Sequence, residues 1–389
     1  MIRPEGRGGM LRPTEGYPEK VPPPSFWGRP TWAEIDLIAL RGNLHRLRRR
    51  LPRRVKILFV VKADGYGHGA AACARTLAAT GMIRWLGVSS VEEGLGLRGA
   101  GIRLPILILG SLYPFESFRV AAEHGLTPTL ASLEAARRLL EARRLSGRPV
   151  HGHIKIETGM NRIGVRPAEG LKVAQFLVRE GLGIGGVYTH FSSADTDPQF
   201  TRRQLSSFSE ALRLMTAAGL RPGLRHAANS AAAVGHPASR LDMVRPGLAL
   251  YGLHPGFEPV LSLKSRLIFI KNVARGTPIG YGAAFRTRRP SRIATIPVGY
   301  ADGLPRGLSN RGEGLVRGRR CPIVGMISMD MAMLDVTDAP LSRVGDEVVL
   351  IGRQGRERIG AVDIAGLLGT VPYEVVARIS ARVPRVYST

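Results

Sequence analysis

Residues 55–69 of the chain read VKILFVVKADGYGHG, an apolar run typical of a buried β-strand that ends abruptly at Lys62. The loop that follows carries glycines, Tyr66 and His68. A lysine at the end of a buried strand is partly desolvated, which lowers the pKa of its amine and frees a lone pair for Schiff-base chemistry. The same lysine could instead cap the strand and extend its ammonium group to water. From this segment alone, both interpretations stay open.

Between residues 55 and 252, short apolar runs alternate with helix-like segments, as in a parallel sheet with crossover helices. This rhythm predicts an α/β fold, a (β/α)8 TIM-like barrel, although periodicity alone leaves a doubly wound open sheet possible. The expected strands are 55–61, 85–89, 105–110, 126–130, 150–157, 184–190, 224–228 and 242–250. The expected helices are 69–79, 132–144 with Ser132 as N-cap, 167–179 and 200–218.

After Ser262 the pattern changes to short β-like runs separated by Gly/Pro turns, which predicts a mainly β C-terminal domain. Its expected strands are 265–271, 292–298, 320–327, 331–336 and 346–351, with a helix near 361–368. We therefore expect three parts: a basic, Pro-rich disordered tail over 1–26, a barrel over 27–262 and a β domain over 263–389. A strand-like segment within 27–38 could pair with the β domain.

The formal charge of the chain is +26, from 7 lysines and 49 arginines against 30 acidic residues. A surface of this kind attracts nucleic acid by releasing counterions from phosphates. The arginines are nevertheless spread along the whole chain, and clusters such as Arg48–Arg50 lack the interleaved aromatic residues of a base-stacking surface. We expect salt-dependent adhesion and no specific nucleic-acid partner.

The compartment is predicted from what the sequence lacks. No apolar run approaches the roughly 20 residues that cross a bilayer, and the N-terminus carries no apolar signal segment, so no membrane association is expected. Two cysteines, Cys73 and Cys321, are too few for a disulfide framework, which favours a reducing cytoplasm. Neither has metal-ligand spacing, and we expect no metal site.

Polar and small residues follow several expected barrel strands, at the face where barrel enzymes gather their catalytic groups. A hydroxyl at Ser230 and backbone donors near Gly247 suit a phosphate, and a lysine able to form a Schiff base then suggests pyridoxal phosphate. Each residue alone could have an ordinary structural role. If all of these roles were structural, however, their joint occurrence at corresponding strand ends would require several coincidences. The set comprises Lys62, Tyr66, Arg162, His190, Asn229, Ser230, Arg245, Gly247 and Leu248.

Nine short motifs, in order between about residues 30 and 388, resemble those of the bacterial alanine racemase family. In the barrel they are VVKADGYGHG at 60–69, KIETGMNR at 155–162, YTHF at 188–191, HAANS at 226–230 and VRPG at 244–247; after it they are GYGA at 280–283, GYADG at 299–303, SMD at 328–330 and YEV at 373–375. The resemblance implies a pyridoxal-phosphate barrel with a C-terminal β domain. It also implies interconversion of L-alanine and D-alanine, which supplies D-alanine for peptidoglycan.

The resemblance further implies two acid/base groups, because racemisation exchanges a proton on both faces of a planar carbanion. Lys62 resembles the cofactor-bearing base of one face, and Tyr281 resembles the base of the other face. Family members take this tyrosine from the partner subunit, which implies a homodimer. Met329 resembles a partner residue whose main-chain amide meets the substrate carboxylate.

The remaining roles are implied in the same way. Arg245 resembles the residue bonded to the pyridine nitrogen, and His190 a histidine that bridges toward that arginine. Arg162 resembles the residue that contacts both the cofactor phenolic oxygen and the substrate carboxylate. Lys155 matches a lysine that is carbamylated in some members, although an ordinary charged strand lysine is an equal alternative. The phosphate shell would comprise Tyr66, Ser230, Gly247, Leu248 and Tyr373, beside Asn229.

Two departures from the family pattern are modest. Asp64 and Gly65 stand where Asn-Ala is another common version, and Ser328 stands where some members have cysteine. A broader or serine-preferring racemase is therefore the nearest alternative. A non-catalytic pyridoxal-phosphate carrier is a further one, but such carriers generally lack a β domain.

Overall fold

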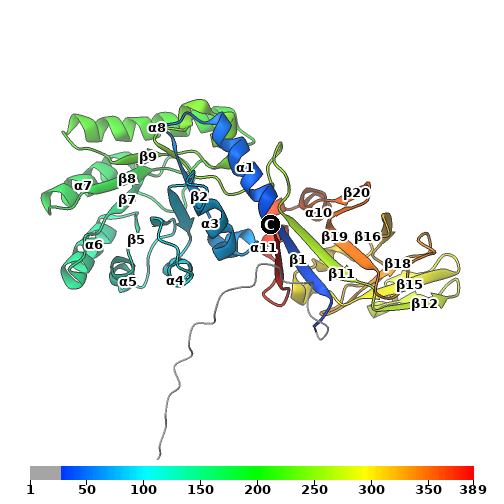
Figure 1. The fold of residues 1–389 in the computed structure, drawn as a ribbon. Coiled ribbons are helices and arrows are strands. Elements are labelled where there is room, and N and C mark those ends of the chain that lie inside the picture. The colour runs from blue at the N-terminus through cyan, green and yellow to red at the C-terminus, as the bar shows by residue number, and fades with distance from the viewer. Residues whose placement is uncertain (1–27) are drawn as a thin grey trace, which may run out of the picture.

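The computed structural model of the chain describes residues 28–389. The tail expected over residues 1–26 lies outside this part. Figure 1 shows a barrel on one side and a β-rich part on the other, with the first and last strands of the described chain at the junction. None of the helices between residues 28 and 389 combines the length and the apolar composition needed to cross a membrane.

The barrel strands pair in parallel and in chain order, as the alternating pattern predicted. They are β2 (Lys56–Val60), β3 (Trp85–Val88), β4 (Ile106–Ile108), β5 (Leu126–Thr127), β6 (Thr129–Leu130), β7 (Gly152–Lys155), β8 (Ile184–Tyr188), β9 (Leu224–His226) and β10 (Met243–Val244). β5 and β6 occupy one position, interrupted at Pro128: Thr127 pairs with β4 and Thr129 with β7. The ring closes between β9 and β10, where Asp242 N donates to Arg225 O at 3.0 Å.

Helices follow the strands and cover the barrel. They are α1 (Leu37–Arg50), α2 (Lys62–Tyr66), α3 (Ala70–Ala78), α4 (Val91–Gly99), α5 (Ser117–Glu123), α6 (Leu133–Ser146), α7 (Pro167–Arg179), α8 (Pro198–Ala217) and α9 (Ser230–Gly235). Ser132 caps α6 as predicted, since its hydroxyl accepts from Ala135 N at 3.0 Å. Helix α8 begins two residues before the expected start at Phe200, because Asp197 caps it and Pro198 suits the first helical position.

The β-rich part contains the last strands and two short helices. They are β11 (Leu261–Arg266), β12 (Phe269–Val273), β13 (Pro278–Ile279), β14 (Phe285–Arg286), β15 (Ser291–Ile296), β16 (Glu313–Val316), β17 (Arg319–Pro322), β18 (Ala332–Asp335), β19 (Glu347–Gln354), β20 (Glu357–Ile359), β21 (Arg385–Ser388), α10 (Ala361–Leu368) and α11 (Pro372–Ala377). Its main sheet also contains β1 (Thr31–Asp36), which runs antiparallel to β11 and parallel to β21.

Three expected strands were wrong in extent, and the one expected over 320–327 ends at Pro322. The strand expected over 242–250 ends at Val244, because Pro246 has no N–H for a ladder and the chain then turns, with Leu250 N bonded to Gly247 O at 2.9 Å. The strand expected over 265–271 is two strands. Between β11 and β12, Leu267 N bonds to Asp346 O and Ile268 N bonds to Thr295 O, so the segment passes from one sheet to another.

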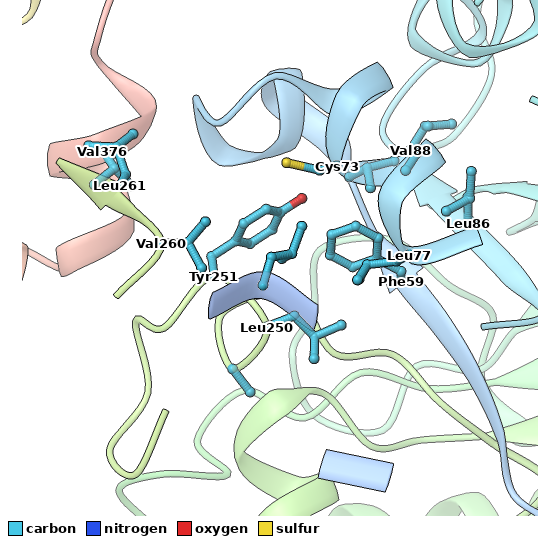
Figure 2. Packing of buried hydrophobic residues seen from close by; sticks show 14 of the residues in the cluster. Phe59, Cys73, Leu77, Leu86, Val88, Leu250, Tyr251, Val260, Leu261 and Val376 are labelled. Carbon is cyan, nitrogen blue, oxygen red and sulfur yellow. The ribbon is translucent and has the colours of Figure 1, made fainter. Parts of the chain in front are cut away.

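One hydrophobic cluster runs through both parts of the molecule. Figure 2 shows its centre at Tyr251, with Phe59 of the barrel on one side and Val260 on the other. The two aromatic rings lie 5.2 Å apart, and Val376 of α11 belongs to the same cluster. The junction is therefore packed as an interior, which fixes the β-rich part against the end of β2.

Candidate functional site

Lys62 begins a tight left-handed turn at the carboxyl end of β2. The φ angles are 52° at Ala63, 50° at Asp64, 63° at Gly65 and 54° at Tyr66, a run that L-residues adopt only at a cost. Glu93 of α4 supports the turn, since its carboxylate accepts from Ala63 N at 2.8 Å and from Ser89 N at 2.7 Å. A strained and supported loop of this kind is typical of a functional site.

The environment of Lys62 favours its neutral form. The side chain is half-buried, and burial is the main cause that lowers the pKa of its amine, followed by the nearby charge of Arg162. Glu93 acts in the opposite direction and raises this pKa. A lowered amine pKa is what the role predicted for Lys62, as a nucleophile or base, requires.

The hydroxyl group of Ser230 and two backbone N–H groups meet at the start of α9. Ser230 is buried, and its Oγ accepts from Gly247 N at 3.0 Å and from Ala249 N at 3.1 Å. Both lone pairs are then used, so its own hydrogen is free to donate to a ligand, and we find no acceptor for it among residues 28–389. Asn229 caps the helix by accepting from Ala232 N at 3.0 Å.

Tyr66 closes this corner of the site. A Cβ atom added at Gly247 would lie 3.1 Å from the Tyr66 hydroxyl, so a larger residue would require Tyr66 to shift by a few tenths of an ångström. Burial raises the pKa of Tyr66 to about 12, and Tyr373 and Glu93 add to the shift, so the phenol stays protonated as a donor. Tyr373 reaches this corner from α11, and Leu248 follows Gly247 in the turn. The donors at this corner suit a phosphate.

Arg245 crosses the barrel interior at the end of β10 and is 3% exposed. Its Nη2 donates to Thr189 O at 2.7 Å and to Ala227 O at 2.9 Å, and lies 3.3 Å from His190 Nδ1. Burial lowers its pKa to about 10, which leaves the guanidinium charged at neutral pH. No acidic side chain in the described chain forms an ion pair with it.

Lys155 adds a second buried cation. It is 5% exposed, and its Nζ lies 5.6 Å from the centre of the Tyr188 ring. Burial, with smaller contributions from the charges of Arg162 and Arg245, lowers its pKa to about 8. Arg162 itself is exposed on the loop after β7. The basic side chains of Lys62, Lys155, Arg162 and Arg245 interact electrostatically at this end of the barrel, and this gathering predicts an anionic ligand.

Two predicted residues lie elsewhere. Tyr281 starts a short 3-10 turn after β13 and is 74% exposed, and Met329 is 52% exposed. The neighbouring Ile279 packs with Ile293 of β15, and Figure 1 shows β15 at the opposite end of the molecule from β2. Among residues 28–389 we find no hydrogen bond or electrostatic interaction between Lys62 and Tyr281 or Met329. The other predicted residues lie at or near the carboxyl ends of the barrel strands, except Tyr373, which lies on α11.

The sequence analysis missed three residues that support the site. Glu93 could have been noticed from the Ser-x-x-Glu capping pattern at Ser90. His226 lies in a quoted motif but received no role, although it accepts from Arg245 Nη1 at 3.0 Å. His153 stands two residues before Lys155 in β7, so the period of a strand places it on the same face.

Comparison with known proteins gives a consistent result. The family model "Alanine racemase, N-terminal domain" matches residues 35–255, and "Alanine racemase, C-terminal domain" matches residues 260–387. An alanine racemase of Symbiobacterium thermophilum is 47% identical, over 92% of this chain and 97% of the relative. One of Halothermothrix orenii is 45% identical with the same coverages. Among solved structures, alanine racemase from Bacillus anthracis with bound L-Ala-P is 36% identical, with a TM-score of 0.87 over 93% of this chain and 96% of that one.

Proposed function

The chain belongs to the alanine racemase family, and on this premise we propose that it interconverts L-alanine and D-alanine with pyridoxal phosphate as cofactor. The observation that carries the proposal is the position of Lys62, with a lowered pKa, beside the turn that holds Ser230 and Gly247. We further propose that the protein acts in the cytoplasm and supplies D-alanine for peptidoglycan.

The residues present fit this cofactor. The hydrogen of Ser230, the hydroxyl of Tyr66 and the close approach at Gly247 suit a phosphate, and the cationic groups suit its charge. Arg245 would face the ring nitrogen. Lys62 would hold pyridoxal phosphate and release it to the amino group of the substrate, where the cofactor would withdraw electrons from the α-carbon and so make its proton acidic.

The protein supplies proton transfer and orientation. Lys62, favoured in its neutral form, takes or returns the proton on one face of the substrate, and Tyr281 does so on the other. Arg162 binds the substrate carboxylate with the main-chain amide of Met329. Arg245 donates hydrogen bonds but keeps its proton at neutral pH, so a ring nitrogen facing it stays unprotonated. This limits electron withdrawal and disfavours transamination.

We infer a homodimer from the same proposal. Tyr281 and Met329 are exposed, and we find no hydrogen bond or electrostatic interaction between them and Lys62 among the described residues, which fits their supply by a second copy. Exposed Tyr300 and Met331 lie in the same part of the chain, where a partner would cover them. A head-to-tail pair would complete two sites at once.

Racemase activity is tested by following the loss of optical rotation of an L-alanine solution, with and without added pyridoxal phosphate. We expect activity that depends on the cofactor and disappears in Lys62→Ala. Borohydride reduction of the wild type should fix the cofactor covalently to Lys62, as mass spectrometry of peptides would show. No activity in the fully reconstituted dimer would reject the proposal.

The broader or serine-preferring racemase is tested with a panel of enantiomerically pure amino acids. One observation favours alanine: the hydroxyl of Ser328 donates to Met331 O at 2.8 Å and accepts from Met331 N at 3.1 Å, so it is engaged within its own turn. A carrier would be indifferent to Tyr281→Phe. A racemase would lose the proton transfer on one face.

A further inference from the structure

Three buried side chains form a line through the barrel interior, from Arg245 to His226 to His153. Arg245 Nη1 lies 3.0 Å from His226 Nδ1, and His226 Nε2 lies 2.9 Å from His153 Nδ1. Both histidines are fully buried. They come from β9 and β7, the two strands that flank β8.

The hydrogen-bond directions in this line follow from the chemistry of its first member. A guanidinium group has donors only, so His226 Nδ1 must accept. A neutral imidazole carries one N–H, which therefore lies on His226 Nε2 and donates to His153 Nδ1. His153 then carries its own hydrogen on Nε2. Burial lowers the pKa of His153 to about 3, and it lowers the pKa of His226 well below its usual value, so both rings stay neutral.

The last atom of the line has no partner. Among the described residues, His153 Nε2 is one of two buried side-chain nitrogen or oxygen atoms without a hydrogen bond. The ring is tightly enclosed: a Cβ atom at Gly186 would lie 2.7 Å from it, and the Trp85 ring is centred 5.2 Å away. An apolar side chain would avoid the unpaired N–H, so a histidine here indicates that its other nitrogen is needed.

We propose that His153 is a positioning residue: it holds His226 in the Nε2–H tautomer, and His226 thereby fixes the guanidinium of Arg245 at the cofactor ring. The opposite tautomer would place an N–H of His226 against the N–H of Arg245. The guanidinium would then lose one of its anchors and keep only those on Nη2. The last step rests on the proposed function, since it requires the cofactor to meet Arg245.

A matched pair of variants tests this role. Asparagine and leucine have nearly the same shape, but only asparagine keeps an acceptor close to the position of Nδ1. We expect His153→Asn to bind pyridoxal phosphate within about threefold of the wild-type Kd, and His153→Leu to bind about tenfold more weakly. Thermal unfolding of the cofactor-free proteins serves as the folding control, because both variants leave the same space beside Trp85.

The tautomer is measured directly by 15N NMR of the histidine-labelled holoprotein, with the His226 signal assigned from its loss in His226→Asn. We expect the Nε2–H form in wild type and His153→Asn, and a changed form in His153→Leu. An Nδ1–H form of His226 in the wild type, or equal Kd values for the two variants, would overturn the inference. A wild type that neither binds the cofactor nor racemises alanine would instead reject the proposed function. In that case the tautomer of His226, measured in the cofactor-free protein, would still decide whether the hydrogen bonds from Arg245 to His226 and His153 run as inferred.

Discussion

At the scale of single residues, the site is defined by positive charge that its own chain does not neutralise. Arg245 and Lys155 are buried, and ion pairs to them are absent from the described residues. Isolated buried charges are costly, so a fold retains them where a ligand or modification supplies the counter-charge. Under the proposed function, a phosphate beside Ser230 and a substrate carboxylate at Arg162 would supply negative charge at this end of the barrel. For Lys155 we propose carbamylation, because carbon dioxide reacts with a neutral amine and the product is an anion beside Arg162.

Lys155→Met should stabilise the cofactor-free protein in carbonate-free buffer. The pKa of Lys155 is about 8 in the folded protein, against an ordinary value of 10.5 for the unfolded chain. Below pH 8 the amine is therefore protonated in both the folded and the unfolded protein, and the folded protein bears the full cost of the buried charge. The free energy of unfolding rises between pH 8 and 10.5, where the unfolded state binds more protons, and the variant lacks this rise. We expect a gain of about 1–2 kcal/mol at pH 7, read from thermal unfolding. Bicarbonate should stabilise only the wild type, and exposed Lys172→Met should change neither result; a destabilised Lys155→Met protein would contradict the assignment.

At the scale of elements, the sequence predicted regular structure well and irregular structure poorly. The helix at 361–368 agrees with α10, because an apolar periodic segment ending at Gly369 carries its own signals. The left-handed turn at Ala63 has no such signal, since its φ angles are imposed by Glu93 and by packing. Helix α11, which presents Tyr373, is too short for a periodic pattern. The residues at the barrel strand ends could be grouped from the sequence pattern, whereas Tyr281, Met329 and Tyr373 followed only from the family resemblance. His153 and Glu93 depend on tertiary contacts, which the pattern does not show.

Arg385 of β21 joins the Lys62 loop to the segment after α11. Its Nε donates to Gly67 O at 3.1 Å, and its Nη groups donate to Ile379 O at 2.6 Å, Ser380 O at 2.6 Å and Val383 O at 2.7 Å. In Arg385→Met these carbonyl groups lose this donor. The Lys62 loop, which carries Tyr66, is then held less firmly against α11, which carries Tyr373. We expect the Kd of pyridoxal phosphate, measured by absorbance titration, to rise about tenfold, or about 1.4 kcal/mol.

The matched control is Arg378→Met on α11, which removes only an exposed ion pair with Glu374 at 3.0 Å. This change should cost at most about 0.5 kcal/mol and leave the Kd within about twofold. Equal effects of the two substitutions would show that Arg385 acts by general stability alone.

At the scale of the whole molecule, the two parts are joined by more than a linker. Strand β1 precedes the barrel in sequence but lies in the sheet of the C-terminal part, between β11 and β21, and one hydrophobic cluster spans both. We propose 27–262 and 263–389 as the domain limits, with β1 exchanged into the second domain. A rigid junction of this kind holds Tyr281 at a fixed distance from the barrel, which suits a site completed by another copy.

Mixing two inactive variants tests this arrangement. If Lys62 of one subunit acts with Tyr281 of the other, a dimer of one Lys62→Ala chain and one Tyr281→Phe chain has one intact site and one doubly altered site. Random reassociation of equal amounts makes about half of the dimers mixed. Activity should therefore return to about a quarter of the wild-type value per subunit after unfolding and refolding together. The two variants refolded separately and then combined are the control, and they should stay inactive if subunits do not exchange. The co-refolded mixture could form mixed dimers, as native mass spectrometry would show, and yet remain inactive. This outcome would place Lys62 and Tyr281 of one subunit in the same site and contradict the proposed assembly.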